Sequence, residues 1–404
     1  MKILYVVPFV PWAVKVRSFN LIPRLARRHE ITLVCVSDEE PSTEQTAWLS
    51  KYCKKAVYIR HTKLEGMLQC AAALPTRTPL RIAYCKSNKA RGEVRQVCEE
   101  LRPDVVYVER WRALQFVPEV RSAPVVCDPT DSMTLFNRRL MKGGAPWERI
   151  LGWVEHSKFM GYEGNLARGV SVCVFCSRVD MECVKEQAPE VQYELVPNGV
   201  DCEKLFFKEE SEEVPGMVVF TGSFKYGPNR HAARYFLQEI FPRVRKDVPE
   251  AKFVAVGNGA VKALAEYRGR AGFEAVDFVP DLRPYLAKAE VAIAPLTVGA
   301  GVSNKLSEGF AVGTAVVSTS LACGDLPVTS GQELLIADGA AEFAKQVVRL
   351  LRDAGLRRQL ALRARMLVEQ QYDWEIVSKK MEMVMQRVVG KEADETSQRA
   401  IATA

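Results

Sequence analysis

The sequence predicts an α/β protein of two consecutive domains, each built around a parallel sheet. Short apolar runs alternate with amphipathic helical segments along nearly the whole chain, which is typical of βαβ units. The chain has 404 residues, enough for two domains of about 200 residues each. A charged, strand-poor stretch over residues 201–216, ending in Pro215-Gly216, divides the alternation and is interpreted as the interdomain linker.

The first domain, residues 1–200, opens with an apolar run at 3–7 that predicts a buried strand. A helix follows at 18–28, with Leu21, Leu25 and Ala26 on one face. The remaining elements alternate in the same way. We expect strands at 31–36, 56–59, 104–108, 125–127, 170–175 and 193–196, and helices at 89–101, 132–141, 147–167 and from 178.

The second domain, residues 217–372, repeats this alternation and is followed by a last helix. We expect strands at 217–220, 252–256, 275–278, 291–295, 315–318 and 333–336, and helices at 229–245, 261–267, 282–289, 306–312, 341–351, 357–370 and 374–388. The tail over residues 391–404 is polar, and we expect it to be disordered.

The composition is that of a soluble globular protein, with 48% apolar and 26% charged residues. No apolar run reaches the roughly 18 residues that span a bilayer, so a cytoplasmic protein is expected. The cysteines are scattered; Cys173 and Cys176 form a C-x-x-C pair inside a strand, where they point to opposite faces. No metal site is therefore predicted.

The positive charge is concentrated in the first half of the chain. Residues 1–200 hold 29 Lys and Arg against 22 Asp and Glu, whereas the second half holds 27 of each. A basic half suits a phosphate-bearing substrate or an anionic membrane surface, or it is simply a solvated surface. No nucleic-acid-binding motif accompanies the charge, so no nucleic-acid partner is expected.

The stretch over residues 291–320 carries the strongest functional signal. A strand leads into the loop Gly299-Ala300-Gly301, a helix starts near Ser303-Asn304-Lys305, and a second strand follows. This layout presents backbone N–H groups and a positive helix end to an anionic ligand. Lys305 and Glu308 are three residues apart on one face, where the lysine suits a phosphate and the glutamate suits vicinal hydroxyls. An ordinary βαβ unit with a solvated lysine explains the spacing equally well.

Acidic residues follow a strand of the first domain. Asp128 and Asp131, in the segment CDPTDS, lie where a strand is expected to end. Paired carboxylates at that place orient hydroxyl groups or stabilise a developing positive charge. The alternative is that Asp131 caps the next helix.

Several segments together resemble a known family. They are VPNGVD at 196–201, FTGSFKYGPN at 220–229, FVPDLRPY at 278–285, GAGVSNKLSE at 299–308 and YDW at 372–374. They are similar to the motifs of glycosyltransferase family four, and nearest to sugar transferases of bacterial exopolysaccharide gene clusters. The resemblance is specific in the second domain and looser in the first. It implies the GT-B fold: two Rossmann-like domains face each other across a cleft, and the C-terminal helix segment 373–390 crosses back to the first domain.

The resemblance assigns roles to single positions. Glu308 matches the acid that holds the ribose hydroxyls of the donor, and Gly222 the glycine beside which the donor passes. The donor-binding positions expected are Gly222, Ser223, Lys225, Val279, Pro280, Leu282, Gly301, Val302, Ser303, Asn304, Lys305 and Glu308. Asp131 or Glu109 is expected to orient the acceptor or to shield positive charge in catalysis.

The chain departs from the family pattern at three places. Ala300 stands where many relatives carry a sugar-binding glutamate. Ser223 stands where many carry a diphosphate-binding arginine, which leaves Lys225, Arg230 and Lys305 as candidates. In the first loop, Ala13-Val14 replaces glycine.

The resemblance implies a metal-independent, retaining hexosyltransferase that uses a UDP- or GDP-hexose in polysaccharide or glycoconjugate synthesis. The acceptor expected is a glycan, a lipid-linked sugar or another molecule, and the enzyme could contact the inner face of the membrane. The departures motivate an alternative, a non-catalytic nucleotide-sugar sensor or partner subunit with the same fold. A nucleotide-sugar epimerase is a third hypothesis.

Overall fold

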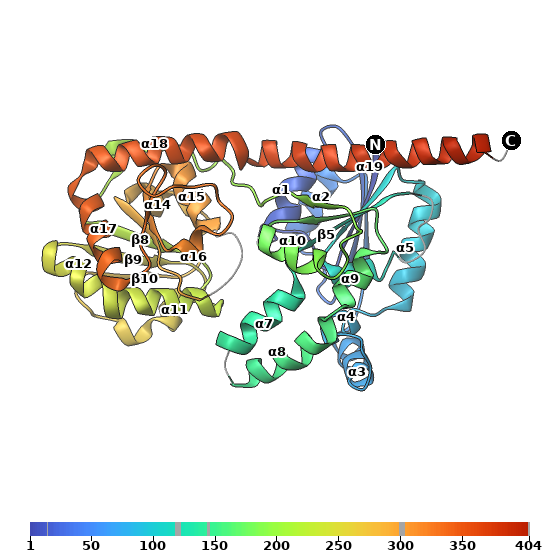
Figure 1. Cartoon of the computed structure of the whole chain (residues 1–404), viewed down its shortest axis with the longest axis horizontal. Helices are drawn as coiled ribbons and strands as arrows, with labels where there is room; N and C mark the ends of the chain where they lie inside the picture. Colours follow the sequence, from blue (N-terminus) through green and yellow to red (C-terminus); the bar gives the residue numbers. More distant parts are fainter. Residues whose placement is uncertain (14, 118–122, 144–145, 299–303, 403–404) are drawn as a thin grey trace. The chain divides into compact units, whose positions relative to one another are not determined.

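Two parallel sheets organise the chain, one in each of two compact units (Figure 1). The computed structural model describes residues 1–404 except 14, 118–122, 144–145, 299–303 and 403–404. Unit 1 consists of Met1–Pro197 together with Val377–Ala404, and unit 2 of Asn198–Ile376. The predicted α/β class with two Rossmann-like sheets is confirmed. The predicted cleft stays a prediction.

The sheet of unit 1 has seven parallel strands in the order β3-β2-β1-β4-β5-β6-β7. Register pairs Ile3 of β1 with Ile31 of β2 and with Val105 of β4. The direction of winding reverses between β1 and β4, which makes their carboxyl ends the usual ligand position of such a sheet. The strands are β1 (Lys2–Val7), β2 (Glu30–Ser37), β3 (Lys55–Arg60), β4 (Val105–Glu109), β5 (Val125–Thr130), β6 (Val172–Phe175) and β7 (Tyr193–Leu195).

The helices of unit 1 differ from the prediction at five places, since four short helices, α2, α3, α4 and α6, were not predicted and one predicted helix is broken. α2 and α3 were not predicted, although Ser42 with Gln45 and Thr62 with Glu65 form capping boxes at their starts. The single helix predicted at 147–167 is broken at Gly161, which has a φ of 77°. The helices are α1 (Val16–Leu25), α2 (Thr43–Tyr52), α3 (Lys63–Ala73), α4 (Leu80–Ala83), α5 (Asn88–Leu101), α6 (Trp111–Leu114), α7 (Met133–Gly143), α8 (Pro146–Phe159), α9 (Tyr162–Ala167) and α10 (Arg178–Lys185).

The sheet of unit 2 has six parallel strands in the order β10-β9-β8-β11-β12-β13, and its winding reverses between β8 and β11. The strands are β8 (Met217–Thr221), β9 (Lys252–Val256), β10 (Phe273–Val276), β11 (Val291–Ala294), β12 (Ala315–Ser318) and β13 (Leu335–Ile336). The helices are α11 (Gly227–Tyr235), α12 (Phe241–Asp247), α13 (Ala260–Ala263), α14 (Arg283–Lys288), α15 (Asn304–Val312), α16 (Ser320–Cys323), α17 (Ala340–Arg352) and α18 (Ala354–Gln371). The helix predicted at 229–245 contains a π turn at Phe236–Ile240.

The segment 201–216, predicted to be a linker, packs onto unit 2. Arg283 forms an ion pair with Glu212 at 2.9 Å, and Arg357 forms one with Glu213 at 2.8 Å. The buried ammonium of Lys208 lies 2.8 Å from the same Glu213 carboxylate. Charged residues that suggested a linker thus form ion pairs with unit 2. The units divide after Pro197 and after Ile376 instead.

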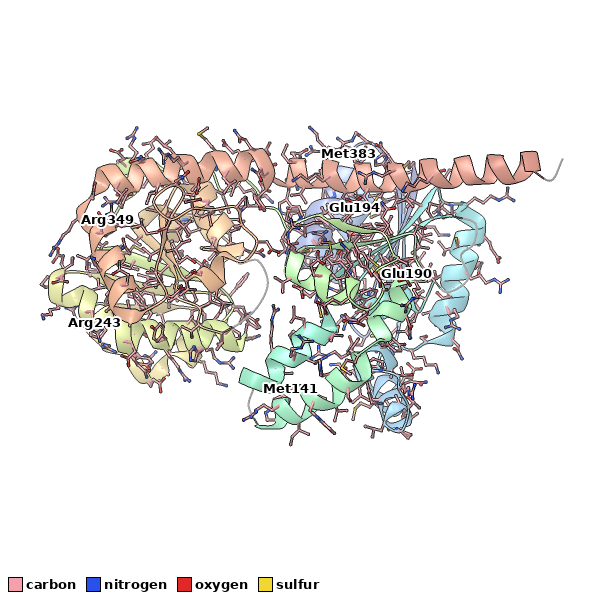
Figure 2. All side chains as sticks on the ribbon, in the orientation of Figure 1. Met141, Glu190, Glu194, Arg243, Arg349 and Met383 are labelled. Carbon is pink, nitrogen blue, oxygen red and sulfur yellow. The ribbon has the colours of Figure 1, made fainter. Side chains whose placement is uncertain are left out.

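The last helix, α19 (Trp374–Ala402), begins in unit 2 and belongs to unit 1 from Val377 onward. Arg28 donates to Glu382 at 3.0 Å, and Nε2 of His29 lies 2.7 Å from the same carboxylate. Arg387 forms an ion pair with Glu194, which is labelled in Figure 2. The polar composition predicted disorder from residue 391 onward, but the helix continues to Ala402.

The segment VPNGVD packs against the start of α19. The amide of Val200 donates to the carbonyl of Tyr372 at 2.8 Å, and the amide of Trp374 donates to the carbonyl of Val200 at 3.1 Å. A Cβ added at Gly199 would lie 2.6 Å from Cδ2 of the buried Trp374 ring. The glycine is therefore required by the indole that packs on it. Among the described residues, no helix is long and apolar enough to cross a membrane.

Candidate functional site

Two glycines with unusual backbone angles follow the carboxyl ends of β8 and β9. Gly222 has a φ of 146° and Gly257 a φ of 139°, conformations that residues with a side chain rarely adopt. A Cβ added at Gly257 would lie 2.1 Å from the carbonyl oxygen of Gly222. The loops after β8 and β9 therefore pack on each other through their backbones, beside the point where the sheet reverses.

Lys305 and Glu308 of α15 lie at the same end of the sheet. A Cβ added at Gly222 would lie 3.6 Å from Cε of Lys305, whose Nζ is 5.5 Å from the centre of the Phe220 ring. Burial raises the pKa of Glu308 to about 7, an effect that Lys305 opposes. Burial lowers the pKa of Lys305 to about 8, an effect that Glu308 opposes. A cation and a two-oxygen acceptor are thus held together in a partly desolvated position, as a phosphorylated ribose requires.

The loop after Gly222 is held by two side chains of α11. Asn229 is 6% exposed and donates to the carbonyl of Ser223 at 2.9 Å. Arg230 donates to the carbonyls of Phe224 and Lys225 at 2.9 and 2.8 Å. Arg230 therefore shapes the loop, while Ser223 and Lys225 have exposed side chains. The role of Asn229 was not predicted, although an asparagine directly after Gly-Pro at a helix start is a signal for such a contact.

The segment predicted to pack on the donor base lies between β10 and α14. Val279 and Leu282 are partly buried against the core of unit 2, and Pro280 is exposed. Phe278, beside them, is 66% exposed. Of the remaining predicted donor-binding positions, Asn304 begins α15, whereas Gly301, Val302 and Ser303 lie outside the described residues, as does Ala300.

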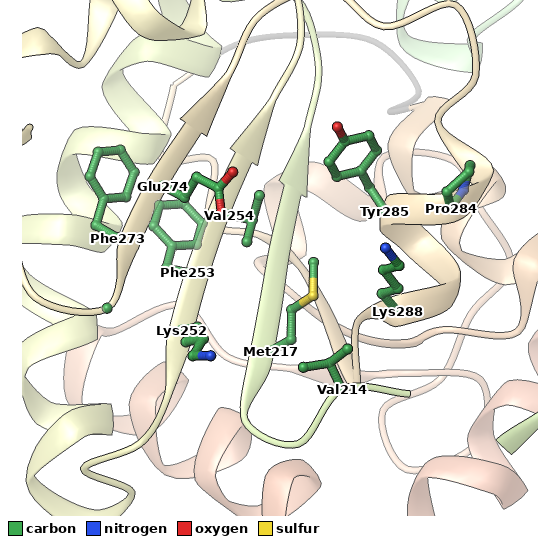
Figure 3. A pocket seen from close by; sticks show the side chains of 11 residues that line it. Val214, Met217, Lys252, Phe253, Val254, Phe273, Glu274, Pro284, Tyr285 and Lys288 are labelled. Atoms are coloured by element: carbon green, nitrogen blue, oxygen red, sulfur yellow. The ribbon is translucent and has the colours of Figure 1, made fainter. Parts of the chain in front are cut away.

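A cavity of about 810 Å³ opens at the other end of the same strands (Figure 3). It is lined by Met217 at the start of β8, Lys252 at the start of β9, and Lys288 at the end of α14. Ligands of open parallel sheets bind at the carboxyl ends of the strands. The cavity at the amino ends is therefore separate from the Gly222–Lys305–Glu308 position.

A buried ion pair joins the start of α1 to β5 in unit 1. Arg17, which is 3% exposed, forms an ion pair with the fully buried Asp128. The hydroxyl of Tyr107 donates to the same carboxylate at 2.5 Å. Arg17 also donates to the carbonyls of Val196 and Pro197 at 3.0 and 3.2 Å. The prediction missed Arg17; a charged residue in an otherwise apolar helix face is the signal that identifies it.

Glu109, predicted as a catalytic candidate, lies inside unit 1. Its side chain is 1% exposed, and one carboxylate oxygen accepts hydrogen bonds from Tyr5 at 3.1 Å and from Ser18. Burial raises the pKa of Glu109, and the neighbouring Arg110 lowers it. The structure thus places Glu109 in a buried hydrogen-bond network, and its catalytic role stays a prediction.

Asp131 is exposed at the carboxyl end of β5, where the sequence placed it. It does not cap α7, because Ser132 accepts from the amide of Leu135 at 3.2 Å and Glu163 accepts from the amides of Met133 and Thr134. The side chain of Asp131 is 47% exposed and forms an ion pair with Arg110 at 3.2 Å. It is available to a ligand. Among the described residues, no group of three or more His, Cys, Asp or Glu side chains is placed to hold a metal ion.

Comparison with known proteins starts from the second unit. Residues 215–353 match the family model described as glycosyl transferases group 1. The structure of HepE from Anabaena in complex with UDP covers 96% of this chain and 100% of its own, with a TM-score of 0.67 and 14% identity. The chain has the GT-B fold of these solved structures. Figure 1 shows both of its Rossmann-like sheets.

Other relatives of this GT-B chain differ in how much of it they match. A 44.6 kDa protein of the cps region of Klebsiella pneumoniae is 20% identical over 361 residues, which cover 85% of this chain and 88% of the relative. A phosphatidyl-myo-inositol mannosyltransferase of Mycobacterium tuberculosis is 27% identical over 237 residues, which cover 55% of this chain and 60% of the relative.

Proposed function

We propose that this GT-B chain transfers a hexose from a nucleotide-activated donor to an acceptor in polysaccharide or glycoconjugate synthesis. The observation that carries the proposal is the grouping of Gly222, Lys305 and Glu308 at the reversal point of a sheet inside the matched group 1 domain. Glu308 accepts hydrogen bonds from the ribose hydroxyls, and Lys305 lies beside the diphosphate. Gly222 has no side chain of its own beside them, which is the property that a close approach of the donor requires.

The proposed reaction retains the configuration of the sugar, as the resemblance to family four implies. Bond cleavage develops negative charge on the leaving diphosphate and positive charge on the sugar. Lys305 and the amino end of α15 stabilise the diphosphate, so no metal ion is required in this proposal. Asp131 is the acid placed to orient the acceptor hydroxyl or to face the positive charge.

A UDP- or GDP-hexose is the proposed donor. HepE has been solved with UDP-glucose, and TarM of S. aureus with UDP. The mycobacterial relatives are named as mannosyltransferases. These facts concern those proteins, and they support a sugar nucleotide without deciding between the two bases.

The test of the proposed function is a panel of UDP- and GDP-hexoses in a thermal-shift assay, followed by measurement of released nucleoside diphosphate. One donor is expected to raise the Tm and to be hydrolysed slowly without acceptor. Binding without turnover, even with acceptors from a bacterial extract, would favour the non-catalytic sensor. A product in which only the donor sugar has changed would indicate an epimerase. Absence of binding by every nucleotide contradicts the proposed function.

We also propose that unit 1 contacts an anionic membrane surface through α3 and α8. Trp147, Ile150 and Trp153 of α8 are 65–68% exposed and three residues apart, on one side of the helix. Three similarly exposed side chains of α3 are Leu64, Met67 and Leu68. Apolar groups that include tryptophan suit the interface between lipid and water.

The two helices are tied together and flanked by cations. Nζ of Lys158 in α8 donates to the carbonyls of Ala73 and Leu74 at the end of α3, at 2.8 and 3.2 Å. Lys63 and Arg149 are exposed residues of α3 and α8, and Arg77 is an exposed residue of the segment after α3. Basic residues near a membrane surface are attracted to anionic lipid, which complements the apolar contact.

Replacing Ile150 and Trp153 together with serine is expected to weaken sedimentation with phosphatidylglycerol vesicles at least tenfold. Burial of each of these apolar side chains in the membrane contributes about 1.5–3 kcal/mol to binding, and the substitution removes that contribution. The matched control is Leu362→Ser with Met366→Ser on α18, where the side chains are 47% and 56% exposed. Equal binding by both variants contradicts the proposal. A dimer that dissociates only in the α8 variant would show that a second copy covers this face.

A further inference from the structure

Unit 1 contains a small cavity lined by four basic side chains at the carboxyl ends of β1, β4 and β5. Its volume is about 210 Å³. The cations are Lys15, Arg81, Arg110 and Arg112, and the apolar lining includes Phe9 and Trp111. The cavity therefore lies where the sheet of unit 1 reverses, which is the usual ligand position of the fold.

The cations of this cavity are poorly neutralised by the protein. Within the described part of the chain, Arg110 forms an ion pair with Asp131, while Lys15, Arg81 and Arg112 form none. Nε of Arg112 is buried without a hydrogen-bond partner. Burial, followed by the charges of Arg112 and Arg110, lowers the pKa of Lys15. Like charges held this close, with a buried donor left unused, need an anion to offset them.

The nearby carboxylates offset the cations only in part: burial lowers the pKa of both Arg81 and Lys15, and Glu155 opposes this at Arg81, as Glu39 and Glu109 do at Lys15. Glu109 accepts from Tyr5 and Ser18, and Glu155 accepts from the amide of Leu80 at 2.7 Å. Lys15 lies over the Phe9 ring with Nζ 4.9 Å from its centre, and Arg81 lies at the same distance from the Phe136 ring. Aromatic rings hold these cations in place without neutralising them.

The backbone supports the same conclusion independently. Arg110 has a φ of 77° and Thr130 a φ of 73°, at the ends of the adjacent strands β4 and β5. Residues with side chains rarely adopt such angles, and this kind of strain is concentrated at ligand-binding positions. The conformation of Arg110 turns the chain so that Trp111 and Arg112 both reach the cavity.

We infer that this cavity binds a phosphate or diphosphate group carried by the acceptor. The inference rests on the proposed function, because it names the acceptor class of that enzyme. Arginine pairs with phosphate through two parallel hydrogen bonds, and lysine adds a point charge. Asp131, paired with Arg110, then lies beside the anchored acceptor. The phosphate belongs either to a lipid carrier or to a soluble phosphorylated sugar, and the chemistry of recognition is the same.

Calorimetric titration with inorganic pyrophosphate tests this inference. The titrations use the full chain carrying Lys305→Ala, so that the donor site does not contribute. Lys15→Ala and Arg112→Ala are each expected to weaken pyrophosphate binding at least tenfold. The control is Lys51→Ala, which also removes a lysine lying over an aromatic ring, with Nζ 5.4 Å from the centre of Tyr52. No binding by the parent, or equal binding by all variants, overturns the inference.

Further measurements separate the sources of the phosphate and the two proposals. Vesicles containing phosphatidic acid that bind through Lys15 and Arg112 would indicate a lipid phosphate. If Lys15 and Arg112 are needed to bind pyrophosphate but not to bind the vesicles, the acceptor is a soluble phosphorylated molecule. Lys15→Ala in the otherwise unchanged chain is expected to bind sugar nucleotides as the parent does. If pyrophosphate binds here but no sugar nucleotide binds at all, the proposed function fails and the anion site stands.

Discussion

Replacing Glu308 with glutamine is expected to lower kcat/KM for the sugar nucleotide about a hundredfold, without lowering the stability of the protein. Glutamine keeps the size of the side chain but offers one acceptor oxygen and no charge. The substitution weakens two charge-assisted hydrogen bonds to ribose hydroxyls. Complete loss of such a bond costs about 1.5–3 kcal/mol. A net loss of about 3 kcal/mol corresponds to about two factors of ten in rate. Steady-state kinetics with the donor from the panel measures the effect.

The pH dependence of donor binding gives a second readout of the same residue. Because burial raises the pKa of Glu308 to about 7, the carboxylate form increases as pH rises through neutrality. Donor affinity in the wild type is expected to rise as pH increases from about 6 to 7.5 and to fall again above about pH 8, where burial makes Lys305 lose its proton. The rise is expected to be absent in Glu308→Gln, whereas the fall remains. The ordinary pKa is 4.5, so the folded state holds this proton longer than the unfolded chain. The protonated Glu308 side chain therefore contributes its full share to the free energy of unfolding below pH 4.5, and this share is lost as pH rises to about 7.

Glu239→Gln is the control for the charge change, since Glu239 is an exposed residue in the same unit. It is expected to match the wild type in kinetics and pH profile. If Glu308→Gln retains wild-type kcat/KM, the ribose-binding role is wrong even if the enzyme is active.

Most of the fold was predictable because parallel strands covered by helices are continuous apolar runs. The runs at Val105 and Val291, for example, coincide with β4 and β11. The prediction failed where tertiary contacts decide the outcome. The segment 201–216 is charged like a linker, but Arg283 and Arg357 of distant helices pair with its glutamates. Local composition does not contain that information.

The candidate site was predictable only where it depends on local spacing. Lys305 and Glu308 lie on one helix, so their separation of three residues was enough to bring them together. Glu109 was chosen as an acid at the end of a strand, but its burial depends on Tyr5 and Ser18, from the first strand and the first helix. The basic cavity combines residues that follow β1, β4 and α3, which are far apart in the sequence. The left-handed backbone conformation of Arg110 cannot be predicted from the type of its side chain.

Replacing Arg17 with methionine is expected to destabilise the protein by about 3–5 kcal/mol, the largest stability effect predicted for this chain. Methionine is similar in length but leaves the carboxylate of Asp128 buried with Tyr107 as a remaining donor. An unpaired buried charge costs far more than the pair itself contributes. The carbonyls of Val196 and Pro197 also lose their donor. Denaturant unfolding followed by circular dichroism measures the loss.

The double variant Arg17→Met with Asp128→Leu separates the two causes of this loss. If the unpaired charge is responsible, removing Asp128 as well restores much of the stability, since buried pairs are often replaceable by apolar residues. If the carbonyl contacts dominate, the double variant is no better than the single one. The control is Arg60→Met, which breaks an ion pair with Glu40 in which both side chains are mostly exposed. That loss should be no more than about 1 kcal/mol, because solvent screens exposed pairs. Similar losses for Arg17 and Arg60 would contradict a structural role for the buried pair in fixing the start of α1.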